Sequence, residues 1–263
     1  MATPKIIDLD FANRSLLFAR LSQISYYNVK EASKQAKKLG FNTIEFYNRD
    51  GAQAYRFSNS SDLVIACRGT EPTCYNDIGA DLNALPAVAE TVSRVHRGFK
   101  TEVDDLWPMI VEDILETENL EKNLWFTGHS LGAAMTTIMA SRCHYDDALP
   151  NPVETYTYGS PRVGWPTYVR SLGTTHHRWV NNNDVVCRVP FAFLGYRHHG
   201  TEHYLNAYGN VRKMTGWQRA KDRMRGIRMG LRKGKIDNFS DHSIGAYAAH
   251  LEVFAQGRER TQN

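Results

Sequence analysis

The fold is decided by residues 124–132, LWFTGHSLG, which precede the small-residue run AAMTTIMA at 133–140. An apolar strand that turns sharply into a helix lifts the serine between them clear of the backbone. The glycines on both sides of Ser130 allow the helix and the strand to approach closely, where a Cβ would obstruct them. This context predicts that Ser130 is a nucleophile. The alternative is a structural turn serine, with no base or acid behind it.

Candidates for the base and the acid follow in the order that sites of this kind use, with the acid before the histidine. Asp184 ends the stretch WVNNND (179–184), where an apolar strand runs into a polar loop. His242 stands at the start of the last amphipathic helix, at its junction with a loop. An imidazole takes the serine proton, and a carboxylate orients that imidazole and stabilises its charged form. The sequence therefore predicts a relay of Ser130, His242 and Asp184. The alternatives are a loop-solvating aspartate and a histidine at a helix N-terminus.

An oxyanion hole is predicted beside this relay. Attack on a carbonyl builds negative charge on its oxygen, and each donor aimed at that charge contributes a factor of about 10²–10³. The backbone amide of Leu131, directly after the nucleophile, is one donor. Thr70 follows the apolar run LVIA (63–66) and can present both an amide and a hydroxyl. The alternative for Thr70 is an ordinary turn threonine.

Several ordered motifs carry a resemblance to a known family. They are ACRGT (66–70), VHRGF (95–99), GHSLG (128–132), YGSPRVG (158–164), the acid loop at 181–190 and HGTE (199–202). From about residue 63 to residue 247 the sequence resembles the class 3 lipases, the fungal-lipase-like branch of the α/β-hydrolases. The resemblance implies a central, mostly parallel sheet flanked by helices, gives Thr70 the oxyanion role and places a lid at 71–86. Cys187 departs from the family, which often has proline after the acid.

The resemblance also implies an activity. It indicates a serine hydrolase of carboxylic esters of lipids, with triacylglycerol as the first substrate and no cofactor. A phospholipase A1 on anionic membranes and a membrane-associated binding protein without turnover are the alternatives. The lid segment carries only Tyr75, Ile78 and Leu82 at helical spacing among several acids. We therefore expect a short, weakly apolar flap with modest interfacial activation, or else an ordinary surface connection.

Length and periodicity predict one domain over residues 1–263. The chain is 42% hydrophobic and contains no run of 18 apolar residues, so no transmembrane helix is expected. Apolar periodicity alternates between strand and helix in the central part. Strands are expected near 42–48, 53–58, 62–68, 123–128, 153–159 and 176–181. Helices are expected near 14–26, 29–39, 99–117, 131–144 and 242–256.

Charge is concentrated in one segment. The chain has 32 Lys and Arg against 28 Asp and Glu, but residues 211–235 hold ten of the bases and one acid. Apolar residues repeat there at helical spacing, which predicts a basic amphipathic helix at about 214–234. Such a helix is typical of a membrane-surface element, so we expect contact with anionic membranes through Trp217, Arg219, Arg223, Arg225 and Arg228. The alternative is a solvated helix whose apolar stripe packs on the enzyme body. No known nucleic-acid-binding module accompanies the charge, so no nucleic acid is expected.

Two further residue types bear on cofactors and location. The four cysteines lack metal-type spacing and are expected to be free thiols. His198, His199 and His203 have no convincing carboxylate or cysteine partner, so no metal is expected. The N-terminal residues lack the apolar core of a secretory signal, which favours a cytoplasmic protein, either free or peripheral to a membrane. A processed N-terminus and another export route are the alternatives.

Overall fold

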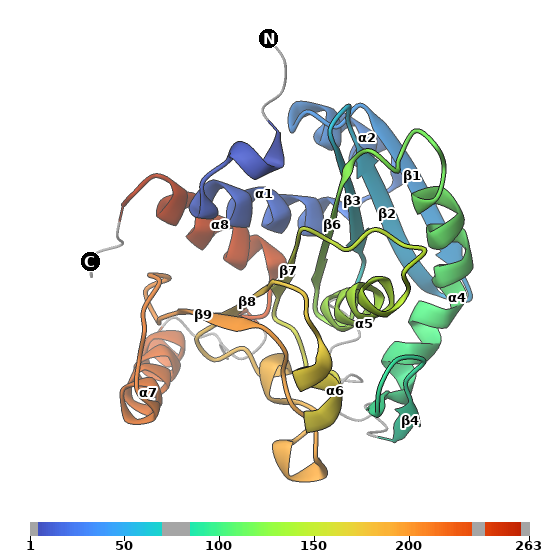
Figure 1. Ribbon diagram of the computed structural model, residues 1–263. Helices are drawn as coiled ribbons and strands as arrows, with labels where there is room; N and C mark the ends of the chain where they lie inside the picture. The colour runs from blue at the N-terminus through green and yellow to red at the C-terminus, as the bar shows by residue number, and fades with distance from the viewer. Residues whose placement is uncertain (1–4, 70–84, 233–239, 259–263) are drawn as a thin grey trace.

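A single sheet of seven strands forms the centre of the computed structural model, which describes residues 5–69, 85–232 and 240–258 (Figure 1). The strand order is β1-β2-β3-β6-β7-β8-β9. The first two pairings are antiparallel, and the pairings from β3 onward are parallel. The strands are β1 (Thr43–Arg49), β2 (Ala52–Ser58), β3 (Asp62–Cys67), β6 (Asn123–His129), β7 (Glu154–Tyr158), β8 (His176–Asn181) and β9 (Thr201–Leu205).

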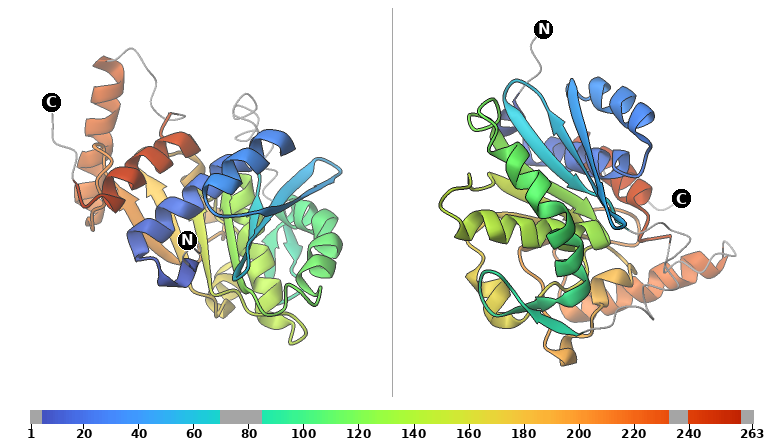
Figure 2. Two further views of the ribbon diagram at one scale, coloured as in Figure 1. Left: turned by 90° about the horizontal axis from the view of Figure 1, so that it is seen from above. Right: turned by 90° about the vertical axis from the view of Figure 1, so that its right-hand side faces the viewer.

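Helices cover both faces of this sheet and enclose two apolar cores (Figures 1 and 2). The helices of one face are α1 (Phe11–Ile24), α2 (Val29–Lys38) and α8 (Ile244–Ala255). Those of the other face are α4 (Arg97–Ile114), α5 (Leu131–Tyr145) and the short α6 (Pro166–Ser171). The remaining elements are η1 (Ile6–Asp8), the hairpin β4 (Pro86–Val88) and β5 (Arg94–His96), η3 (Val186–Arg188), η4 (Ala192–Leu194) and α7 (Gly216–Arg232).

Strand β6 joins the two cores and positions the turn that follows it. Leu124 and Phe126 enter the core under α4 and α5, while Trp125 enters the core under α1 and α8. A strand buried on both faces reads as a continuous apolar run, as this one does. Because its register with β3 and β7 is specified on both sides, Ser130 leaves the sheet at one defined point.

The expected α/β-hydrolase fold is confirmed. Helix α1 begins at Phe11, earlier than expected, because the Asp10 side chain caps it by accepting a hydrogen bond of 2.8 Å from the Asn13 amide. Helix α8 begins at Ile244, so His242 lies in the loop before the helix and not in its first turn. The hairpin β4–β5 and helix α6 were not predicted, because elements of three to six residues are too short to show periodicity.

Helix α7 stands at the edge of the molecule beyond β9, where the basic helix of about 214–234 was expected (Figure 1). Of the expected lid at 71–86, residues 71–84 lie outside the described residues. In the parts of the chain that the structure describes, no helix is both long and apolar enough to cross a bilayer.

Candidate active site

The turn between β6 and α5 holds Ser130 in a backbone conformation that side chains rarely adopt, with φ 59° and ψ −127°. The flanking glycines make this turn sterically feasible. A Cβ on Gly128 would lie 2.4 Å from the carbonyl oxygen of Gly132, and one on Gly132 would lie 2.2 Å from that of Cys67. The Ser130 amide donates a hydrogen bond of 3.1 Å to the carbonyl of Tyr158. The strained turn is thus held by β3 and β7, the two neighbours of β6.

Three residues far apart in the sequence meet at this turn. The Nε2 atom of His242 lies 2.8 Å from the Oγ of Ser130. Its Nδ1 atom lies 2.9 and 3.0 Å from the two carboxylate oxygens of Asp184. All three side chains are buried, with at most 1% exposed. With Nδ1 protonated and donating to Asp184, Nε2 is free to accept the serine proton. The structure therefore brings together all three predicted residues in a geometry suited to nucleophilic catalysis.

Asp184 remains ionised in this buried place because of its hydrogen-bond donors. Tyr247 donates from its hydroxyl at 2.7 Å, and the Val186 amide donates at 2.9 Å. Burial by itself would raise the pKa of Asp184, but the charge of His242 and the hydrogen bonds from His242 and Tyr247 outweigh it, so its pKa lies below the ordinary value. Tyr247 was not singled out in the sequence. Its position in α8, five residues after His242, is the only local signal.

Gly159, just after β7, is a second site residue that sequence reasoning missed. Its φ is +61°, and a Cβ built on it would lie 2.7 Å from Oδ2 of Asp184 and 2.8 Å from Nδ1 of His242. Any side chain here would press on the hydrogen bond between the acid and the histidine. The available signal was the motif YGSPRVG (158–164), whose first glycine stands at the end of a predicted strand.

His129 forms a support beneath the catalytic histidine. Its Nε2 donates to the carbonyl oxygen of His242 at 2.6 Å, and its Nδ1 accepts from the Tyr26 hydroxyl at 2.8 Å. Its ring centroid lies 4.5 Å from that of His242. Burial lowers the pKa of His129 to about 3, so the ring is neutral at neutral pH. A neutral His129 holds the loop that carries His242 without placing a second positive charge beside it.

Of the two predicted oxyanion donors, Leu131 and Thr70, the structure describes Leu131. Leu131 is the first residue of α5, where a backbone amide has no partner within its own helix. Its amide is thus available beside Ser130. Thr70 lies outside the described residues. The preceding Gly69 packs against the nucleophile turn, since a Cβ on it would lie 3.0 Å from the Ser130 Cβ.

With this geometry established, comparison with known proteins identifies the family. A family model described as Lipase (class 3) matches residues 46–194, more than half of the chain. The chain belongs to the class 3 lipase family. The predicted resemblance to the class 3 lipases is therefore confirmed.

Individual class 3 lipases are similar to this chain at moderate identity. A lipase of Rhizomucor miehei is 33% identical over 163 residues, which cover 59% of this chain and 44% of the relative. The secreted mono- and diacylglycerol lipase 1 of Fusarium solani is 33% identical over 121 residues, covering 43% of this chain and 34% of the relative. The chain thus spans less than half the length of these curated relatives. The structure of Rhizomucor miehei triacylglyceride lipase superimposes with a TM-score of 0.65 at 26% identity, covering 73% of this chain and 79% of that one.

The five residues expected at a membrane surface divide between the two sides of α7. Trp217, Arg225 and Arg228 are exposed. Arg219 instead forms an ion pair with Glu202 of β9, and Arg223 is partly buried with its Nε enclosed. A carboxylate on the enzyme body thus already binds the Arg219 guanidinium, and membrane contact through these five residues stays a prediction.

Four histidines of β8, β9 and the segment before β9 form two separate pairs. His176 lies 3.1 Å from His199 between their Nδ1 atoms, and His177 Nδ1 lies 3.1 Å from His203 Nε2. His198 Nε2 instead donates to the Cys187 carbonyl at 2.9 Å. Within the described residues no group of three His, Cys, Asp or Glu side chains has the arrangement of a metal site.

The described cysteines are free and buried. They are Cys67, Cys143 and Cys187, while Cys74 lies outside the described residues. Burial raises the pKa of the Cys67 and Cys143 thiols to about 12. They are therefore protonated core side chains and not nucleophiles.

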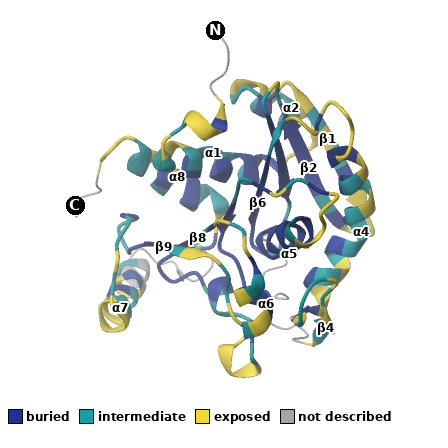
Figure 3. Ribbon diagram, in the orientation of Figure 1, coloured by how far each residue is buried: buried dark blue, intermediate teal, exposed yellow. Residues whose placement is uncertain are grey.

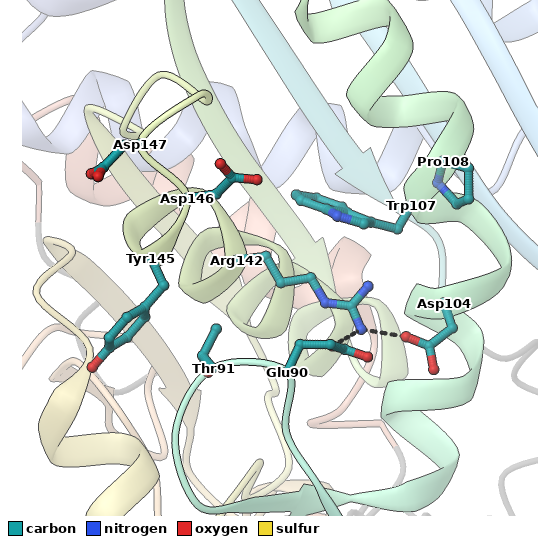
Figure 4. A pocket seen from close by; sticks show the side chains of 9 residues that line it. All are labelled: Glu90, Thr91, Asp104, Trp107, Pro108, Arg142, Tyr145, Asp146 and Asp147. Atoms are coloured by element: carbon teal, nitrogen blue, oxygen red, sulfur yellow. Dashed lines mark hydrogen bonds and ion pairs between the residues drawn. The ribbon is translucent and has the colours of Figure 1, made fainter.

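A polar cavity of about 680 Å³ lies at the far end of α5, between α4 and the β4–β5 hairpin (Figure 4). Arg142 sits between Glu90 and Asp104 there and forms ion pairs with both. Arg142 is twelve residues beyond Ser130, and at 1.5 Å rise per residue it lies about 18 Å along the helix. This cavity is thus separate from the catalytic relay, and its central charges are already paired.

Proposed function

We propose that the chain is a serine hydrolase of carboxylic esters of lipids. The observation that carries the proposal is the buried hydrogen-bonded chain from Ser130 through His242 to Asp184. Relatives named as lipases and as mono- and diacylglycerol lipases support a lipid ester as the substrate. Triacylglycerol and partial acylglycerols are the substrates we favour over phospholipids.

The mechanism follows from the geometry. His242 takes the proton from Ser130 as its Oγ attacks the ester carbonyl, and Asp184 stabilises the imidazolium that forms. The Leu131 amide stabilises the oxyanion, and Thr70 is proposed as the second donor. The imidazolium then protonates the leaving alcohol. Water, activated by His242, releases the fatty acid from the acyl-enzyme in the same way.

The test is covalent labelling combined with a substrate panel. A fluorophosphonate probe is expected to label wild-type protein and to leave Ser130→Ala unlabelled. Hydrolysis of triacylglycerols, diacylglycerols and phosphatidylcholine is then compared, with the fatty acid released as the readout. Folded protein that takes no label would overturn the proposal in favour of a binding protein. Release of fatty acid chiefly from phospholipids would replace the acylglycerol lipase by a phospholipase A1.

We further propose that the enzyme meets its substrate at a lipid–water boundary and is peripheral to anionic membranes. The basic segment 211–235 supports this contact, because cations beside a membrane surface are attracted by anionic headgroups. A cytoplasmic location remains our proposal.

A further inference from the structure

Helix α7 exposes four apolar side chains along one side. Trp217 is 68% exposed, Met224 53% and Ile227 40%, and Ala220 between them is exposed as well. Exposed residues occur along α7 in the ribbon coloured by burial (Figure 3). A surface helix of a globular protein ordinarily turns its apolar stripe toward the core. The alternative that this stripe packs on the enzyme body is therefore wrong for these four residues. Exposed apolar patches rimmed by polar side chains are typical of interaction surfaces.

Polar contacts on the inner side hold α7 in this orientation. Asp222 is buried, and its Oδ2 accepts hydrogen bonds from the Tyr204 hydroxyl at 3.1 Å and the Ala207 amide at 3.0 Å. Arg219 pairs with Glu202, and its guanidinium lies 4.6 Å from the centroid of the Tyr204 ring. Turning the stripe inward would break these contacts and bury charges without partners. The apolar side is thus fixed toward the outside.

Cations flank the exposed stripe. The Lys221 Nζ lies 3.3 Å from the centroid of the Trp217 ring, and Arg225 is half exposed. Among the residues that the structure describes, neither Lys221 nor Arg228 has a carboxylate within ion-pair distance. A hollow of about 500 Å³ on this side is lined by Ala220, Lys221, Met224, Arg225 and Arg228. Three cationic side chains thus surround a space that opens among apolar groups.

The charge of the rest of the chain indicates which surface fits. Outside residues 211–235 the chain has 22 basic against 27 acidic side chains, a net charge of −5, whereas the segment itself carries +9. An anionic surface therefore attracts the α7 end and repels the remainder. Apolar side chains between cations match the boundary between headgroups and acyl chains.

Helix α7 also lies directly on the loop of the catalytic acid. Asn183, the residue before Asp184, donates from its side chain to the Arg223 carbonyl at 3.0 Å. Gly226 packs so closely that a Cβ on it would lie 2.1 Å from the side-chain nitrogen of Asn182. A surface bound by α7 therefore lies at the end of the sheet that carries the relay. The exposed side chains of Phe191, Phe193 and Leu194 follow the same acid loop.

We propose that the outer face of α7, formed by Trp217, Lys221, Met224, Ile227 and Arg228, docks on an anionic lipid bilayer. The apolar side chains enter the headgroup boundary, and the cations bind anionic headgroups. The proposal rests on the proposed function, because docking presents the relay to a surface that holds its substrate.

The test measures vesicle binding separately from turnover, with the full chain carrying Ser130→Ala. Sedimentation with phosphatidylcholine vesicles, with and without 30 mol% phosphatidylserine (about one lipid in three, enough for a strong surface potential), gives the two affinities. The double variant Lys221→Gln and Arg228→Gln is expected to bind anionic vesicles about 25-fold more weakly, at about fivefold per charge. The matched control, Lys30→Gln with Lys37→Gln, removes the same charge from exposed positions of α2 and should bind as before.

Each outcome decides the matter. Trp217→Ser should also weaken binding, and an unchanged thermal midpoint of each variant shows that its fold is intact. Equal binding to neutral vesicles, an unchanged affinity of the double variant, or an equal loss in the control would overturn the docking surface. A concentration-dependent dimer that Trp217→Ser abolishes would assign this face to a second copy of the chain instead. If the Ser130→Ala chain binds anionic vesicles through α7 but wild type cleaves no ester, the proposed function fails and the docking surface stands.

Discussion

Gly159→Ala is expected to push the catalytic acid and the histidine apart without replacing either residue. The new Cβ would lie 2.7 Å from Asp184 Oδ2 and 2.8 Å from His242 Nδ1. Restoring van der Waals contact at about 3.4 Å requires a displacement of about 0.7 Å, and misplacements near 1 Å cost on the order of 10²-fold in rate. Loss of the orienting acid altogether costs about 10⁴-fold. We therefore expect kcat on a soluble short-chain ester to fall between about 10² and 10⁴-fold.

The control for this substitution is Gly51→Ala. Gly51 also has a positive φ, +96°, but nothing lies within 4 Å of its would-be Cβ. Both variants carry the cost of a left-handed backbone, about 1–2 kcal/mol, or a thermal midpoint lower by roughly 2–8 °C. Only Gly159→Ala should also lose kcat and the rate of fluorophosphonate labelling. If both variants lose stability equally and Gly159→Ala keeps wild-type kcat, the steric reasoning is refuted.

The other predictions concern buried polar contacts. Tyr247→Phe removes a donor from Asp184 and an acceptor from the Asn181 amide, which should raise the pKa of Asp184 and cost about 1–3 kcal/mol of unfolding free energy. Because folding depresses the pKa of Asp184, the stability that its ionised form contributes is lost as pH falls. The unfolding free energy of the variant, measured from pH 6 to pH 2, should therefore fall less steeply than that of wild type. Burial lowers the pKa of His96 to about 4, so between pH 6.5 and about 4 the unfolded chain takes up a proton at this residue and the folded protein does not. This costs the wild-type protein about 3 kcal/mol of unfolding free energy as the pH falls through that range. His96→Phe should remove that part of the fall in stability. Gly226→Ala should lower both the thermal midpoint and kcat, since its Cβ collides with the loop before the acid.

The Tyr247 and Gly226 variants each have a matched control. Tyr145→Phe is the control for Tyr247→Phe. It removes the hydroxyl of an exposed tyrosine that donates to the Ser171 carbonyl, and it should change neither the pH dependence of stability nor kcat. A Tyr247→Phe protein whose stability equals that of wild type and falls equally with decreasing pH would contradict the hydrogen bond from Tyr247 to Asp184. Gly216→Ala adds a Cβ with nothing within 4 Å, so it should not destabilise α7. Equal effects at Gly216 and Gly226 would contradict the close packing of α7 on the acid loop. A His96→Phe protein that loses stability with falling pH as wild type does would contradict the buried neutral imidazole.

Local patterns accounted for much of the fold and for the relay. The buried strand β6, the glycines around Ser130 and the periodicity of α5 are all properties of neighbouring residues, so they can be read from spacing alone. Asp184 and His242 were predicted because each stands at the junction of a periodic segment and a polar loop. The order of the motifs then indicated the class 3 lipase family.

The supports of the relay were not predictable in this way. His129 and Tyr26 are 103 positions apart, and Tyr247 is 63 positions from Asp184. Such contacts depend on which strands become neighbours, which local spacing does not specify. Gly159 shows the same limit. A side chain there would collide with Asp184 and His242, which belong to two distant segments, so the need for glycine does not come from its own turn alone.

Helix α7 shows most clearly what each level of description determines. The sequence by itself predicted a basic helix with one apolar stripe at about 214–234, because charge and periodicity are local, and the structure has α7 at Gly216–Arg232. Only the tertiary structure decided that the stripe faces outward, because Glu202 and Tyr204 of β9 bind the opposite side. In the same way the motif GHSLG (128–132) determined that Ser130 stands on a sharp turn, while the packing of α8 and the loop after β8 decided that His242 and Asp184 reach it. The physical reason is that a turn or a stripe is specified by adjacent residues, whereas its partners are specified by the assembled sheet.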